Sequence, residues 1–165
     1  ILSVKSQLNI PVHVMIRPRA GDFLYNNVEI KQMANDIAFC KEAGVDGVVF
    51  GILKEDKTIN INAVEKLADI GKSMKLVFHK AIDETPAILE AVKSLRESGV
   101  VNGILTSGGE NTASEGIHQL KNIIALAGDM EVICAGKITT TNLEELHGEI
   151  NAKAYHGKRI VSGLE

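Results

Sequence analysis

Two arginines and an aspartate lie close together near the start of this sequence, and their types suit the binding of an anion. Arg17 and Arg19 are two residues apart, and Asp22 follows them. Residues two apart share one face of a strand, and a guanidinium group binds carboxylate or phosphate oxygens in pairs. The structural alternative is that both arginines pair with Asp22 or with carboxylates of neighbouring strands. The residues by themselves leave the two interpretations open.

The segment around His79 holds groups that can transfer protons. His79 is followed by Lys80 and Asp83. An imidazole can act as a general base, ligate a metal or anchor a ligand by a hydrogen bond. We predict a site role for His79, whereas a salt bridge is the better interpretation of Lys80. Asp83 also suits the N-terminus of the helix that follows, where a carboxylate is stabilised.

Glycine-rich segments recur in the second half of the sequence, and each follows an apolar run. They are Thr106-Ser107-Gly108-Gly109, Ala135-Gly136-Lys137 and Tyr155-His156-Gly157-Lys158. Glycine lets the backbone approach a ligand closely, and the N–H groups of such loops bind oxyanions. None of them completes a dinucleotide-binding or P-loop pattern. Their position in successive loops is more informative, because barrel phosphate sites often use the loops after strands seven and eight, here the loops at Gly136 and His156-Gly157.

The two cysteines lie far apart and form no CxxC motif. Cys40 falls on the apolar stripe of a predicted helix, which indicates a buried structural thiol. Cys134 lies in a predicted strand beside Gly136, at a possible mouth position, and we consider it either structural or a soft metal ligand. The absence of a disulfide framework favours a reducing compartment.

The elements that position these side chains can be predicted from the sequence. Short apolar segments alternate with amphipathic stretches, as is typical of repeated βα units. Most of the apolar segments are apolar on both faces, as expected for a parallel sheet covered by helices. Strands are predicted over residues 11–18, 47–53, 76–82, 103–107, 131–135 and 154–160. Six such units fit an open doubly wound sheet or most of a (β/α)8 barrel.

The predicted helices carry recognisable start and stop residues. A helix over residues 29–43 is followed by Gly44 as a C-cap, and another is capped by Asn62. A third helix is capped by Thr85 and closes at Gly99. The capping-box spacing recurs before the last two helices, in the pairs Thr112 with Glu115 and Thr141 with Glu144.

The strand count and the start of the sequence favour the barrel. The sequence opens without Met, in what reads as the second half of a helix, so we expect that its beginning is absent. Two further N-terminal strands with their intervening helix would give eight strands and a length close to the typical ~250 residues. We therefore predict a single α/β domain over residues 1–165, a TIM barrel without those two strands. The unpaired barrel edges predict low solubility or self-association.

Composition argues against several classes of function. The 165 residues include 18 Lys and Arg against 21 Asp and Glu, a formal net charge of -3, so no broad cationic field is available for phosphate backbones. Aromatic residues make up 4% and Trp is absent, which argues against base-stacking surfaces. No apolar run reaches the roughly 18 residues of a membrane span. We expect a cytoplasmic protein without nucleic-acid or membrane partners.

Three segments of the sequence, residues 10–23, 77–83 and 104–108, resemble the CutC copper homeostasis family. The patterns Arg-Pro-Arg-x-Gly-Asp-Phe and Phe-His-basic-Ala-x-Asp carry the likeness, which extends to His156-Gly157. The resemblance implies a cytosolic TIM barrel that binds copper and serves copper tolerance, with a homodimer as the expected assembly. It also implies that the cysteines usually invoked as ligands lie in the two N-terminal strands that we expect to be absent from this sequence. Copper(I) favours soft ligands, and within this sequence only Cys134, with Met15 or His79, could serve.

The competing hypothesis is an enzyme that acts on a small anionic substrate, a phosphate or a carboxylate, at the barrel mouth. Its predicted catalytic residues are His79, Asp83 and His156. Its predicted ligand-binding residues are Arg17, Arg19, Asp22, Thr106, Ser107, Gly108 and Gly136. A third hypothesis is an interaction scaffold without a metal. We predict copper homeostasis first, with copper as the only cofactor suggested, and leave open whether the protein is an enzyme.

Overall fold

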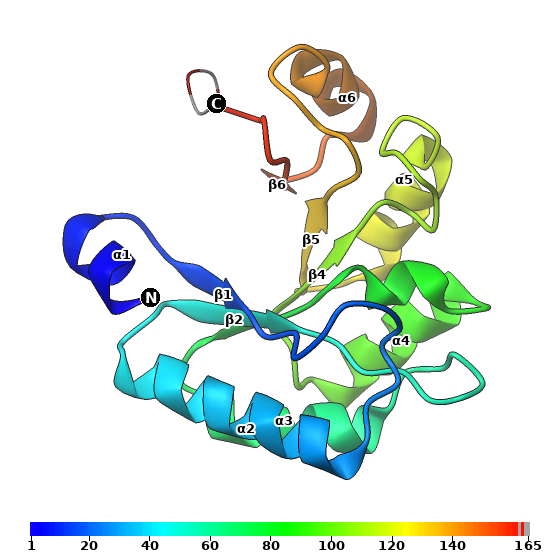
Figure 1. Ribbon diagram of the computed structural model, residues 1–165. Helices are drawn as coiled ribbons and strands as arrows, with labels where there is room; N and C mark the ends of the chain where they lie inside the picture. The colour runs from blue at the N-terminus through cyan, green and yellow to red at the C-terminus, as the bar shows by residue number, and fades with distance from the viewer. Residues whose placement is uncertain (162, 164–165) are drawn as a thin grey trace.

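The computed structural model describes residues 1–161 and 163, and its strands form one curled parallel sheet (Figure 1). The strands pair in chain order, each with the next. A doubly wound sheet would reverse its strand order, so this order defines a partial TIM barrel. The strands are β1 (His13–Met15), β2 (Gly47–Phe50), β3 (Lys75–Phe78), β4 (Gly103–Thr106), β5 (Glu131–Cys134) and β6 (Ala154–Tyr155).

Helices α2 to α6 each follow a strand and lie along the outer side of the curl, whereas α1 precedes β1 (Figure 1). Within the described residues β1 and β6 are the two edges of the sheet and do not pair with each other. No helix in this part of the chain combines the length and apolar character needed to cross a membrane. The helices are α1 (Leu2–Gln7), α2 (Asn27–Glu42), α3 (Ile61–Gly71), α4 (Ile88–Ser98), α5 (Ile117–Leu126) and α6 (Leu143–Ile150), with a 3-10 helix η1 (Lys80–Glu84) between β3 and α4.

The two faces of the sheet bury different side chains because neighbours along a strand point to opposite sides. The outer face and the helices share one large core that includes Phe50, Phe78 and Ile104, all fully buried. The inner face carries a smaller cluster built on Val77, Leu105 and Ala135. The sheet is therefore apolar on both sides, as the sequence predicts.

Several helix boundaries differ from the predicted ones. Asn60, not Asn62, caps α3, and its side chain accepts a hydrogen bond from the Ala63 amide at 3.2 Å. Thr85 ends η1 instead of capping the third helix, because α4 begins only at Ile88. The predicted helix end at Gly99 is confirmed, because this residue is the C-cap of α4 and adopts the left-handed conformation with φ of 64°.

The last two predicted capping boxes do not begin helices. Thr112 accepts a hydrogen bond from the Glu115 amide at 3.2 Å, but this pair forms in a turn before α5. At α6 the N-cap is Asn142 rather than Thr141, and its side chain bonds back to Thr139 instead of capping the helix.

Most predicted strands are longer than the observed ones. The prediction over 76–82 is wrong beyond Phe78, because the chain turns into η1 and buries Ala81 and Ile82 there. The strands predicted over 11–18 and 154–160 shrink to β1 and β6. At both sheet edges the chain leaves the ladder early, and the freed residues enter the loops that form the mouth of the barrel.

Candidate functional site

The loops after the strands meet at the carboxyl edge of the sheet, and His79 is a deeply buried polar residue there. Its side chain is 3% exposed, and its ring lies against Phe23 with centroids 4.7 Å apart. The Nδ1 atom accepts a hydrogen bond from the Ala81 amide at 3.2 Å. Burial lowers the pKa of His79 from 6.5 to about 4, so the ring is neutral at pH 7.

The hydrogen bond at Nδ1 decides what His79 can do chemically. Because Nδ1 accepts, we assign the proton of the neutral ring to Nε2. Within the described residues Nε2 is buried without a hydrogen-bond partner. It is therefore a donor ready for a ligand oxygen, and it is poorly suited to act as a base. Metal binding through Nε2 would require the proton to move to Nδ1, which would break the bond to Ala81.

Arg17 lies over the aromatic side chains of the same loop. Its guanidinium is 4.7 Å from the centroid of the Phe23 ring, a cation–π geometry, and it donates to the Gly21 carbonyl at 2.6 Å. No carboxylate lies within 4 Å of Arg17 among the described residues. The hydroxyl of Tyr25, in the same loop, is buried without a partner there. Arg17 thus keeps its charge available for an anion.

Arg19 is instead fully engaged within the protein. It donates five hydrogen bonds, including bonds to Glu29 Oε1 at 2.6 Å and Asp22 Oδ1 at 2.8 Å. A guanidinium has five N–H donors, so the side chain has none left for a ligand. The hydrogen bond from Arg19 also lowers the pKa of Asp22. The contact between Arg19 and Glu29 ties the loop after β1 to the start of α2, which is the structural alternative that the sequence left open.

Asp83 joins the loops after β3 and β4. Its carboxylate accepts hydrogen bonds from the Thr106 hydroxyl, the Ser107 amide at 3.1 Å and the Gly109 amide at 3.0 Å. Lys80 completes the cluster with a salt bridge of 2.6 Å, as the sequence predicts for this lysine. Thr106 and Ser107 are fully buried. The predicted site residues Asp83, Thr106 and Ser107 therefore do contact one another, but their hydrogen bonds hold the loops of the mouth together.

Cys134 ends β5 at the carboxyl edge of the sheet, but its side chain points into the helix-covered outer core and not into the barrel mouth, which the sequence indicated as a possible position. Its thiol is fully buried in the outer core, whereas the next residue, Ala135, belongs to the inner cluster. Burial raises the pKa of Cys134 to about 11. Met15 lies on the inner face, 50% exposed and paired with Val49, so it does not converge with Cys134. The described residues contain no group of three or more His, Cys, Asp or Glu side chains that could hold a metal ion.

The loops after β5 and β6 come together, as expected for loops that follow successive strands of a barrel. They line a pocket of about 490 Å³ that includes Gly136, His156 and Gly157. Lys158, the last residue of the third glycine-rich segment, and Arg159 also line this pocket, and neither was predicted to be a site residue. Phe23 and Tyr25 were likewise not predicted to be site residues, although Phe23 is part of the Arg-Pro-Arg-x-Gly-Asp-Phe pattern.

The curled parallel sheet and the polar mouth at its carboxyl edge define a protein of the TIM-barrel class. The family model described as the CutC family matches residues 1–161. The chain belongs to the CutC family.

Relatives and a solved structure agree with this assignment. A human protein named copper homeostasis protein cutC homolog is 39% identical over 93% of this chain. A CutC family protein of Aliivibrio fischeri is 38% identical over 89% of it. A crystal structure described as the copper homeostasis protein CutC of Streptococcus agalactiae superposes with a TM-score of 0.91 at 32% identity, covering 97% of this chain and 80% of that one.

The chain spans 56% and 60% of the length of the human and Aliivibrio relatives. The names of these relatives favour copper homeostasis over the enzyme hypothesis.

Proposed function

We propose that this chain takes part in copper homeostasis. The observation that carries the proposal is its membership of the CutC family across residues 1–161. Two of its relatives bear the name copper homeostasis protein, one by sequence and one by structure. The chain spans less than two thirds of the length of these sequence relatives. That this chain carries out the role of a whole relative is therefore itself proposed.

We propose copper(I) as the cargo and Cys134 as its ligand in this chain. Copper(I) prefers soft thiolate or thioether ligands. Of the two free thiols, Cys134 ends β5 at the carboxyl edge of the sheet, whereas Cys40 lies on α2. His79 is less suitable because its free nitrogen carries the proton. A second soft ligand would come from the copper donor.

Copper would reach Cys134 by displacement of β6. Cys134 pairs with Tyr155, and β6 is an edge strand of only two residues, Ala154 and Tyr155, both half-buried. Short edge elements with little buried surface open at the smallest cost in free energy. Deprotonation of the thiol adds to this cost because burial raises its pKa to about 11. The proposal therefore predicts copper(I) binding that is slow and weaker than at an open thiolate.

A cytoplasmic location and a homodimer complete the proposal. Both cysteines are free thiols, as is usual in a reducing compartment. The two sheet edges and exposed apolar side chains such as Ile10 and Met15, 63% and 50% exposed, offer surface that a second copy could cover.

An anaerobic titration tests the copper proposal. The chain competes for copper(I) against a chromogenic chelator in the presence of glutathione, beside the variants Cys134→Ala and Cys40→Ala. We expect one copper(I) per chain, an affinity at least ~10-fold lower for Cys134→Ala, and an unchanged affinity for Cys40→Ala. Circular dichroism spectra of both variants establish that they are folded. A wild-type chain that does not compete, or a Cys134→Ala variant that competes equally, contradicts the proposal.

A further inference from the structure

The pocket formed by the loops after β5 and β6, with Lys80 of η1 and Asn111 after β4, concentrates positive charge in an acidic protein. Its volume is about 490 Å³, and its lining includes Lys80, Lys137, Lys158 and Arg159 but no Asp or Glu. The whole chain carries a formal net charge of -3. A concave site with charges of one sign raises the local concentration of ligands of the opposite sign.

Three of these cations are available to a ligand. Lys80 is paired with Asp83. By contrast, Lys137, Lys158 and Arg159 have no carboxylate within 4 Å in the described part of the chain. His156 lies in the same lining and adds two ring nitrogens. The copper proposal uses none of these four side chains.

Close backbone contacts fix the shape of the pocket. A Cβ atom at Gly157 would lie 2.0 Å from the Ile138 carbonyl oxygen, so only glycine allows the two loops to touch. Gly136 has φ of 110°, and a Cβ there would lie 2.8 Å from the Ala113 nitrogen. Hydrogen bonds also join the loops, from the Thr140 amide to the Arg159 carbonyl at 3.1 Å. A pocket held in this way loses little conformational entropy when a ligand binds.

We propose that this pocket binds the phosphate group of a small phosphorylated molecule. A phosphate monoester carries nearly two negative charges at pH 7 and three strong acceptor oxygens, which matches several cations better than a single carboxylate does. The pocket lies at the carboxyl ends of β5 and β6, the last two strands of the sheet. In eight-stranded TIM barrels the loops after strands seven and eight frequently bind phosphate, and β5 and β6 would take these two places if two further strands precede β1. This inference does not depend on the copper proposal.

Nuclear magnetic resonance tests the proposal on the whole chain. A ¹⁵N-labelled sample is titrated with inorganic phosphate at pH 7.5, with sodium chloride adjusted to hold the ionic strength constant. We expect saturable shifts of the amide signals of Gly136, Lys137 and Gly157, and a smaller response to acetate at the same ionic strength.

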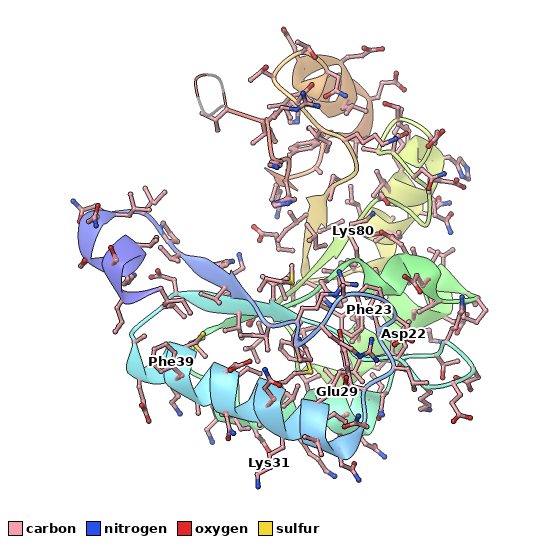
Figure 2. All side chains as sticks on the ribbon, viewed as in Figure 1. Asp22, Phe23, Glu29, Lys31, Phe39 and Lys80 are labelled. Atoms are coloured by element: carbon pink, nitrogen blue, oxygen red, sulfur yellow. The ribbon has the colours of Figure 1, made fainter. Side chains whose placement is uncertain are left out.

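Charge variants distinguish a specific phosphate site from nonspecific electrostatic attraction. Lys158→Glu is expected to weaken phosphate binding at least ~10-fold, and Lys158→Gln less, because it removes the charge without reversing it. Lys31→Glu is the matched control, because this lysine points to solvent from α2, away from the sheet (Figure 2). Unsaturable shifts, or equal weakening by Lys31→Glu and Lys158→Glu, overturn the proposal.

Discussion

Replacement of Asp83 tests whether this carboxylate braces the barrel mouth. In Asp83→Ala the Thr106 hydroxyl and the Ser107 amide, both fully buried, lose their acceptor. A buried donor left without a partner costs about 1 to 3 kcal/mol, so the two together cost roughly 2 to 6 kcal/mol. The Gly109 amide is exposed and water can replace its acceptor. The salt bridge to Lys80 adds little because the lysine side chain is 41% exposed.

The assay is urea unfolding followed by circular dichroism, with thermal unfolding as a second measurement. A loss of about 3 kcal/mol corresponds to a fall in Tm of roughly 6 to 12 °C for a chain of this size. Asp83→Asn keeps one acceptor oxygen and should lie between Asp83→Ala and the wild type. Glu84→Ala is the control, because this neighbouring carboxylate is exposed and a surface change costs about 0.5 kcal/mol or less. A loss below about 1 kcal/mol for Asp83→Ala would refute the role of Asp83 as a brace.

Two further predictions concern His79 and the loop contact at Gly157. Burial lowers the pKa of His79 to about 4, so the unfolded chain binds the proton more readily, and the free energy of unfolding should fall by about 3 kcal/mol as pH drops from 6.5 to 4. Urea unfolding at a series of pH values checks this, and a His79→Gln variant with the same pH dependence as the wild type would contradict it. Gly157→Ala should cost about 2 kcal/mol or more, because its Cβ would lie 2.0 Å from the Ile138 carbonyl oxygen. Gly148→Ala in α6, where a Cβ meets nothing within 4 Å, should leave stability unchanged or raise it slightly in the same unfolding assay.

The order of elements could be predicted because it depends on short-range signals. Each strand is a short apolar run, and each is followed by a helix with a periodic apolar stripe. Gly99 marks a helix end because glycine adopts the left-handed conformation without steric cost. Parallel strands joined by helices then leave few possible topologies. These local rules were sufficient for the class of fold.

The direction of individual side chains depended on contacts distant in the sequence. Alternation predicts that Cys134 and Ala135 point to opposite faces, but not which face the helices cover. Arg19 finds its partner Glu29 only because the capping box at Asn26 holds that carboxylate at the start of α2. His79 follows an apolar strand with further apolar residues after it, so periodicity could not distinguish a longer strand from the turn of η1.

The most direct test of the copper account is the ultraviolet charge-transfer absorption of a copper–thiolate bond, recorded during an anaerobic titration with copper(I) in the absence of glutathione and of the chelator. The account predicts that this band grows to one equivalent in the wild type and in Cys40→Ala and does not develop in Cys134→Ala. A wild-type chain without the band, or a Cys134→Ala variant that retains it, would show that the thiol of Cys134 does not bind copper and would contradict the account.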